Sequence, residues 1–238
     1  MDSRSRGHAH LAERIVTRPT MREVTAFPWV TGILVAVVLL AWVLVAVQQG
    51  LAEAAGGLRH TLLHGPSDAV LLDDGALNGA TLAAGEYWRL LSSQLFHAKL
   101  GHMLFNALGL AVVGTALERR VGSWWLLIIA VVGGICGQLA SVLAYPALVS
   151  SGASQTALAL VAGFGVVVIW QRWRGDTRQG TPGWIATAGA ALYLCVSLAL
   201  DLSTTHTVKA GHVAAIVAGV LLTLALRYSM PVCVRIAR

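Results

Sequence analysis

Between Arg120 and Arg172 the chain has 51 consecutive residues without a single Asp, Glu, Lys or Arg. A helix needs about 20 apolar residues to cross the hydrocarbon core of a bilayer, so this stretch is long enough for two crossings. Its middle contains Tyr145-Pro146 and, shortly after, Ser150-Ser151-Gly152. Proline cannot continue a helix, and the serines and glycine favour a turn. The stretch therefore predicts two membrane-spanning helices joined by a turn.

The composition of the whole chain also indicates an integral membrane protein. Hydrophobic residues make up 56% of the sequence and charged residues only 12%, about half the charged fraction of a soluble domain. Apolar runs bounded by charged or turn residues predict an all-α bundle of six spans, at Trp29–Val47, Leu100–Leu117, Ser123–Ala144, Ser154–Gln171, Gly183–Leu200 and Ala210–Leu226. We expect a basic N-terminal tail at 1–27, a membrane domain at 28–230 and a short basic tail at 231–238.

The positions of the basic residues predict how the bundle is oriented. Thirteen of the 17 Lys and Arg residues lie before the first span, after the last one, or in the connections that follow spans two and four. The remaining four are Arg59, Arg89, Lys99 and Lys209. By the positive-inside rule both termini are then cytoplasmic, and the long loop at about 48–99 lies outside. Such a loop is too long for a simple connector, so we expect it to have structure of its own.

The net charge of +6 does not indicate a nucleic-acid partner. The basic residues sit at the ends of apolar runs instead of forming one continuous patch, so membrane topology explains them better. The lipid bilayer is the partner that this pattern predicts.

Polar residues collect at one depth of the predicted bundle. Spans two, four and six all start from the outer side, and each has polar residues in its first two turns: His102 and Asn106, Ser154 and Gln155, and His212. Polar and ionisable groups inside spans usually face a cavity or the bundle interior. Packing of the fourth and sixth spans would therefore bring Ser154 and His212 into contact.

These residue types can perform nucleophilic catalysis. Serine needs an adjacent base, which a neutral histidine supplies at hydrogen-bonding distance. A carboxylate partner is not evident: Glu118 lies 16 residues after His102 on the same predicted helix, and Asp201 is expected to be a solvated loop residue. The residues thus predict a serine–histidine dyad rather than a triad.

Donors for a developing oxyanion are also available at that depth. His102 and Asn106 stand four residues apart, on one face of a helix, and both side chains have N–H groups. The backbone N–H of Ser154, at a helix start, has no acceptor within its own helix. These groups are the candidate oxyanion donors.

The sequence resembles the rhomboid family of intramembrane serine proteases. The motifs that carry the resemblance follow one another in order: Gly85-Glu86-Tyr87-Trp88-Arg89, Phe96-His97, His102 with Asn106, Glu118-Arg119, Gly122, Gly152-Ala153-Ser154-Gln155, and Gly211-His212 followed by Ala215 and Gly219. Together they cover about 75–226, nearly the whole predicted membrane domain.

The resemblance implies a role for each matching residue. Ser154 would be the nucleophile, His212 the general base, and His102 and Asn106 the oxyanion stabilisers, with Gln155, Gly152 and His97 as modulators of the site. Trp88 and Arg89 would belong to the first outer loop, and Glu118 and Arg119 would fasten the cytoplasmic end of the second helix. The family fold is a six-helix bundle that needs no metal or organic cofactor. Its substrates are single-span membrane proteins cut near the outer end of the span, which for this chain suggests a bacterial plasma membrane.

The chain departs from the family pattern at three positions, and other functions stay open. Gln155 replaces the glycine after the nucleophile, Leu158 an aromatic residue, and Ala215 the first glycine after the histidine. Gln155 either crowds the oxyanion site or donates a hydrogen bond to it. One alternative is an inactive rhomboid-like pseudoprotease that binds transmembrane segments. Another is a transporter or a metal or haem protein that uses His97, His102 and His212. The natural substrate and the oligomeric state are not evident from the sequence.

Overall fold

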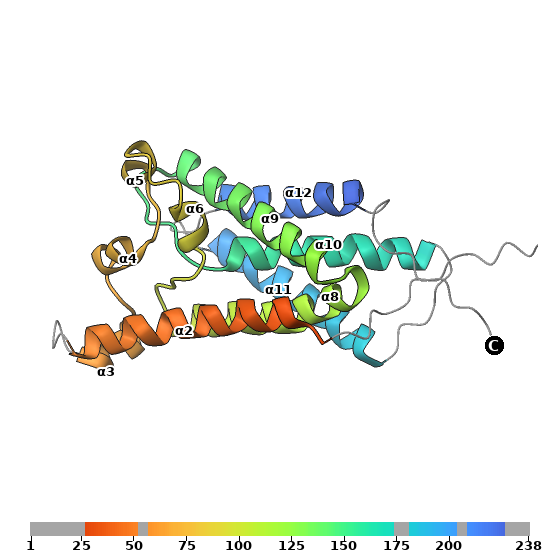
Figure 1. The fold of residues 1–238 in the computed structure, drawn as a ribbon, viewed down its shortest axis with the longest axis horizontal. Helices are drawn as coiled ribbons and strands as arrows, with labels where there is room; N and C mark the ends of the chain where they lie inside the picture. Colours follow the sequence, from red (N-terminus) through yellow and green to blue (C-terminus); the bar gives the residue numbers. More distant parts are fainter. Residues whose placement is uncertain (1–26, 52–56, 174–180, 204–208, 227–238) are drawn as a thin grey trace, which may run out of the picture.

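The computed structural model describes residues 27–51, 57–173, 181–203 and 209–226, which form a bundle of helices (Figure 1). In chain order the elements are α2 (Trp29–Leu51), α3 (Gly57–His64), α4 (Asp68–Asp74), α5 (Gly79–Ala83), α6 (Arg89–Ser92), α7 (Leu100–Gly109), η2 (Leu110–Gly114), α8 (Thr115–Val121), α9 (Ser123–Ala144), α10 (Ser154–Trp173), α11 (Thr181–Ser203) and α12 (Lys209–Leu226). The predicted tails at 1–27 and 231–238 fall almost entirely outside the described residues.

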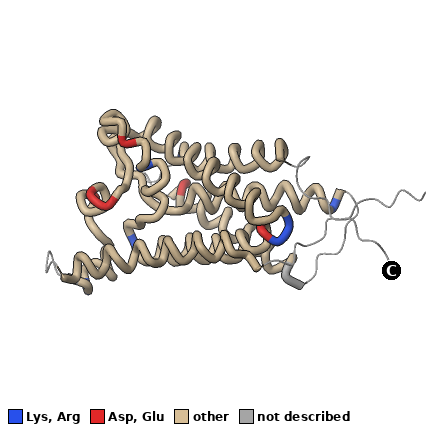
Figure 2. Tube along the Cα trace, in the orientation of Figure 1, with Lys and Arg blue, Asp and Glu red and all other residues tan. Residues whose placement is uncertain are grey.

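Six helical segments are long and apolar enough to cross a membrane, which confirms the predicted six-span bundle. Charged residues gather toward the two ends of the bundle, and its middle is almost free of them (Figure 2). The boundaries differ from the prediction at several ends. The most important difference is in the fifth span, because α11 continues past Leu200 to Ser203. The prediction that Asp201 is a loop residue is therefore wrong.

The second span is one continuous helical rod with a wider turn in its middle. The elements α7, η2 and α8 follow one another without a break, and η2 is a π-helical segment. Glycines stand at both ends of this segment: Gly109 packs against the ring of Tyr193 and Gly114 against Thr31, and a Cβ at either position would come within 3.0 Å of that neighbour. Wide turns of this kind are frequent at functional sites.

Small residues let α9, α10 and α12 approach closely. In α12, Gly211, Ala215 and Gly219 are all buried. A Cβ on Gly219 would lie 2.3 Å from the carbonyl oxygen of Ala159 in α10, and one on Gly211 would lie 1.8 Å from Ser141 Oγ in α9. Close backbone contact between membrane helices relies on such small residues. This close packing of α9, α10 and α12 places the start of α12 beside the start of α10.

The long loop at about 48–99, predicted to lie outside and called the outer loop below, has structure of its own, as its length predicted. It contains α3 to α6 and lies at one end of the bundle (Figure 1). Arg89 fastens it by bonds to Glu86 and to the backbone oxygens of Leu72 and Ala76. Leu77 and Ser150 then join the loop to the turn that precedes α10 by a pair of backbone bonds of 3.1 and 2.7 Å.

At the opposite end of the bundle Glu118 joins α8 to the start of α2. Its carboxylate accepts bonds from the backbone N–H groups of Val30 and Thr31, at 3.1 and 2.8 Å, and from the Thr31 and Ser123 hydroxyls. The first N–H groups of a helix lack acceptors within the helix and attract negative charge. The neighbouring Arg119 is exposed. Glu118 therefore caps α2 from another helix.

Candidate active site

Ser154 and His212 meet at the end of the bundle where the outer loop lies. Ser154 is the first residue of α10 and His212 the fourth of α12. Ser154 Oγ lies 3.0 Å from His212 Nε2, within hydrogen-bonding distance. Ser154 is only 5% exposed, so the pair is largely enclosed by the protein. The structure thus brings together the two residues predicted as nucleophile and base.

A third residue, Asp201, contacts the other side of the His212 ring, contrary to prediction. Its carboxylate oxygens lie 2.8 and 3.0 Å from His212 Nδ1. Asp201 is 9% exposed rather than solvated. The misplacement came from ending the fifth span at Leu200, the last apolar residue of its run. A signal was present, because Tyr193, Ser197 and Asp201 continue one helical face at intervals of four residues.

His97 anchors Asn106 and the turn before Ser154. Its Nε2 lies 3.1 Å from the backbone N–H of Ala153, which can only donate, so Nε2 must be an acceptor. The proton then sits on Nδ1, which donates to the carbonyl oxygen of Leu95 at 3.2 Å. Burial, and secondarily the nearby His102, lower the pKa of His97 to about 3. His97 is therefore neutral at ordinary pH.

This tautomer also fixes the orientation of the Asn106 carboxamide. Because His97 Nε2 accepts, the group of Asn106 that faces it at 3.0 Å is the amide nitrogen. The Asn106 oxygen is then free to accept the bond of 2.6 Å from the Tyr193 hydroxyl. Tyr193 is itself held, because its ring stacks on Phe105 with centroids 4.6 Å apart. Asn106 keeps one further amide N–H for another acceptor.

His102 lies against the turn that presents Ser154. Gly152 has a backbone φ of +116°, a conformation that residues other than glycine rarely adopt. A Cβ at this position would lie 3.0 Å from His102 Cε1 and 3.5 Å from His97 Cδ2. The two imidazole rings also meet edge to face, with centroids 5.3 Å apart. Gly152 thus allows both histidines to pack beside the nucleophile.

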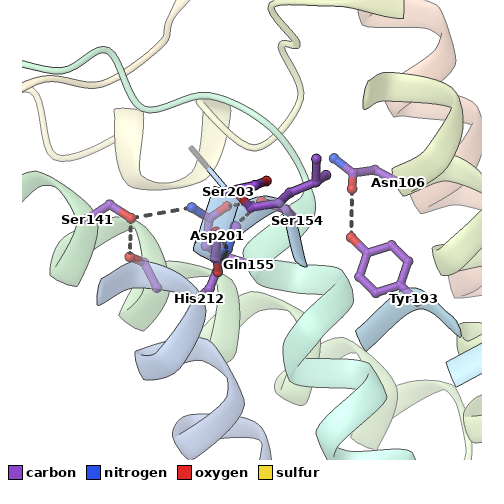
Figure 3. Close-up of polar contacts among 10 residues, drawn as sticks. Asn106, Ser141, Ser154, Gln155, Tyr193, Asp201, Ser203 and His212 are labelled. Carbon is purple, nitrogen blue, oxygen red and sulfur yellow. Dashed lines mark hydrogen bonds and ion pairs between the residues drawn. The ribbon is translucent and has the colours of Figure 1, made fainter. Parts of the chain in front are cut away.

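Gln155 lies on the opposite side of Ser154 from Asn106 (Figure 3). Ser154 Oγ is 3.0 Å from Gln155 Oε1, and the Gln155 amide nitrogen lies 3.4 Å from Ser141 Oγ on α9. Gln138 lies 3.5 Å from the same Gln155 oxygen and accepts a bond of 2.6 Å from Ser150. Gln155 is fully buried in this group. Its amide therefore faces α9 and neither crowds nor donates to the side where Asn106 lies.

The remaining residues singled out in the sequence lie outside this contact group. Trp88 and Arg89 are in the outer loop, where the Arg89 guanidinium stacks on the Trp88 ring at 4.6 Å. Glu118 and Arg119 are at the far end of the bundle. Among the described residues, no group of three or more His, Cys, Asp or Glu side chains is placed to hold a metal ion. Sequence reasoning missed Tyr193, Gln138 and Ser141, which are polar residues on otherwise apolar helices.

Comparison with known proteins identifies the family. The profile of the rhomboid domain matches residues 84–229, which is more than half of the chain. The rhomboid protease GluP of Bacillus subtilis is 43% identical over 81 residues, covering 33% of this chain and 16% of its own length. RHOMBOID-like protein 4 of Arabidopsis thaliana is 33% identical over 106 residues, covering 44% of this chain and 27% of its own.

A third relative gives the longest alignment of the three. Rhomboid-like protease 3 of Toxoplasma gondii is 26% identical over 160 residues, which cover 66% of this chain and 58% of that protein. The chain thus spans only part of the length of each of these relatives. The matched region nevertheless contains every residue of the contact group around Ser154, from His97 to His212. This integral multi-pass membrane protein belongs to the rhomboid family.

Proposed function

We propose that the chain is an intramembrane serine endopeptidase with Ser154 as nucleophile and His212 as general base. The observation that carries the proposal is the 3.0 Å contact between Ser154 Oγ and His212 Nε2 within a buried site. Family membership supports the same chemistry, because relatives such as GluP are named as proteases. Neither residue needs a cofactor for this reaction.

The proposed reaction follows from the contacts of the two side chains. His212 Nε2 accepts the Ser154 proton while Ser154 Oγ attacks the carbonyl carbon of the scissile peptide. The protonated His212 then gives this proton to the departing amine, which leaves an ester between Ser154 and the N-terminal part of the substrate. A water molecule, deprotonated by His212, hydrolyses that ester and restores both residues.

The oxyanion that forms during each attack needs N–H donors on one side of Ser154. We assign this role to the second amide N–H of Asn106, to His102 and to the backbone N–H of Ser154. The fixed orientation of the Asn106 amide supports the assignment, since a donor that is already aimed needs no reorganisation during the reaction. Loss of one such donor typically costs about 2.7–4 kcal/mol of transition-state stabilisation.

The substrates that fit this site are single-span membrane proteins, cut near the outer end of the span. Ser154, at the start of its helix, and His212 lie at the end of the bundle that carries the outer loop. The excess of Arg at the opposite ends of the spans supports placing both termini in the cytoplasm and the site on the outer side of the membrane. We take this membrane to be a bacterial plasma membrane.

A fluorophosphonate probe on the full-length protein in membranes tests the proposal. We expect labelling of the wild type and cleavage of a single-span test substrate, with both lost in Ser154→Ala. Ser151→Ala, in the turn just before α10, is the matched control and should keep both activities. A folded wild type that neither reacts with the probe nor cleaves any of a panel of single-span substrates would overturn the proposal.

One contact favours a second candidate, an inactive rhomboid-like pseudoprotease. Ser154 Oγ is as close to Gln155 Oε1 as to His212 Nε2, at 3.0 Å in each case. A hydroxyl has a single proton, so a bond donated to Gln155 leaves His212 without a proton to accept. In that case Gln155→Gly should gain probe labelling that the wild type lacks. Labelling of the wild type excludes this candidate.

A further inference from the structure

We propose that Asp201 is a positioning residue for His212, so that the site works as a chain of three groups from Asp201 through His212 to Ser154. The inference rests on the proposed function, and it replaces the two-residue site expected from the sequence. It is carried by the contact of both Asp201 oxygens with His212 Nδ1, at 2.8 and 3.0 Å.

The fold places this carboxylate at the site for a simple reason. Asp201 is the third residue from the end of α11, and His212 is the fourth residue of α12, the next helix along the chain. Consecutive spans cross in opposite directions, so the end of one and the start of the next lie at the same depth. Extension of α11 beyond the apolar run therefore brings Asp201 level with His212.

Burial makes the contact directional. The side chains of Asp201 and His212 are each only 12% exposed, so little water competes for their hydrogen-bonding atoms. An ionised carboxylate can only accept, so the proton of a neutral His212 must sit on Nδ1. The lone pair of Nε2 then faces Ser154 Oγ. This is the tautomer that a base for Ser154 requires.

Asp201 also acts after the proton has moved. When His212 holds the proton from Ser154, its ring carries a positive charge in a site with little water. A carboxylate at 2.8 Å lowers the energy of that charged state, and such contacts are stronger in a low-dielectric interior than in water. Asp201 thus favours both the starting tautomer and the charged intermediate.

One face of α11 serves both sides of the nucleophile. Tyr193, Ser197 and Asp201 stand at intervals of four residues and are all buried. Tyr193 orients Asn106 through a bond of 2.6 Å, while Asp201 holds His212. The same helix therefore aims a candidate oxyanion donor and the candidate base. An ion pair that merely joined α11 to α12 would not require the carboxylate to meet the ring nitrogen opposite Ser154.

The decisive variant is Asp201→Asn, which keeps the shape and removes the charge. In the full-length protein we expect kcat to fall roughly 10²- to 10⁴-fold with KM little changed, since an amide can also stabilise the wrong tautomer. The acid limb of the kcat/KM profile should move to lower pH, because the charged His212 has lost the carboxylate that contacts its ring.

The surroundings of His212 allow that pH shift to be assigned to Asp201. Among the residues that the structure describes, the other titratable groups beside His212 are His102 on α7 and Lys209, one turn earlier on α12, and both remain in the variant. The groups that face the site from α9 and α10 are Ser141, Ser154 and Gln155, none of which titrates in this range. Asp68→Asn, at an exposed position of α4, removes the same charge far from the site and should leave the profile unchanged.

Three outcomes overturn the inference and are distinct from failure of the proposed function. They are an unchanged kcat in Asp201→Asn, a reduced kcat with the acid limb still at the wild-type pH, and a change in KM alone. All three presuppose an active wild type, whereas an inactive wild type refutes the function itself. If Asp201→Asn does not purify as a folded protein, Asp201→Ser replaces it with the same expected kcat loss and pH shift.

Discussion

Two polar clusters that differ in chemistry adjoin Ser154. One is the histidine cluster, made up of His97, Asn106, Tyr193, Asp201 and His212. Its side-chain contacts are 2.6–3.2 Å long, and a carboxylate and a backbone N–H fix the direction of each bond. Directional bonds hold protons on chosen atoms, which is what a reaction with proton transfer needs.

The other is the amide cluster, made up of Gln138, Ser141, Ser150 and Gln155. The bonds that its two amide nitrogens donate are 3.4–3.5 Å long, and its members can act as donors or acceptors in either direction. No member titrates. We therefore expect the histidine cluster to set the rate of the proposed reaction and the amide cluster to set how firmly α9 and α10 pack.

The largest expected effect comes from replacing His212, the proposed general base in the histidine cluster. In His212→Gln we expect cleavage to fall about 10³-fold or more, because Ser154 loses its proton acceptor. Turnover of a single-span substrate by purified protein measures this. His64→Gln, at an exposed position of α3, is the control and should be as active as the wild type. Near-normal turnover in His212→Gln would contradict the role of His212 as the base.

Two variants test whether the orientation of the Asn106 amide affects kcat. Asn106→Ala removes a proposed oxyanion donor, and we expect kcat to fall roughly 10²- to 10³-fold. Tyr193→Phe removes the bond of 2.6 Å that orients Asn106, together with a bond to Ser197, but leaves the Asn106 donor in place. We therefore expect a smaller loss, about 10-fold, with KM little changed. Steady-state kinetics on both variants provide the measurement. A Tyr193→Phe enzyme with wild-type kcat would contradict the orienting role.

The fold and three of the five residues of the histidine cluster, His97, Asn106 and His212, could be predicted from the sequence. The length of apolar runs fixes the number of spans, and the shared depth of Ser154 and His212 follows from counting spans in alternating directions. Asp201 could not be placed in the same way, because apolarity marks where a span enters lipid and not where its helix ends. In α11 the helix continues beyond that point, where the Asp201 carboxylate contacts the ring of His212.

The amide cluster was harder to predict for another physical reason. Gln155 stands beside the nucleophile in sequence, but its direction depends on the helix that packs against it. Gly137 on α9 leaves room for its side chain, since a Cβ there would lie 2.6 Å from Gln155 Cγ. A single sequence does not reveal that glycine and glutamine face one another. Helix packing, rather than position in the motif, decides which side of Ser154 the amide occupies.

A double-mutant cycle across this contact should affect stability more than rate. We expect Gly137→Ala to lower the free energy of unfolding by about 1–3 kcal/mol, because the added methyl group overpacks the contact. Gln155→Gly should lower it by a similar amount, because buried hydrogen-bonding partners are left unsatisfied. The double variant should lose less than the sum, because the closest contacts of the new Cβ are with the Gln155 side chain and only the one of 3.0 Å with the Gly211 oxygen remains. Thermal unfolding and turnover in detergent measure both effects. Losses that add fully, or a rate loss above tenfold in an equally folded Gln155→Gly, would contradict the division between clusters.

The smallest expected effect concerns pH and the neutral state of His97. Burial lowers the pKa of His97 to about 3, whereas the unfolded chain has the ordinary value of about 6.5. Between these values the unfolded state binds more protons, so stability falls as the pH drops below 6.5 and is unaffected by this residue above it. At pH 5 the loss amounts to about 2 kcal/mol.

His97→Gln removes this titration and isolates its contribution from that of the other histidines. The wild type should lose more thermal stability between pH 7.5 and pH 5 than this variant, even if the variant is less stable at pH 7.5. Melting curves of the two proteins in the same detergent at both pH values give the comparison. Equal losses would show that His97 is protonated without unfolding, and the Asn106 amide would then lose the acceptor that fixes its orientation.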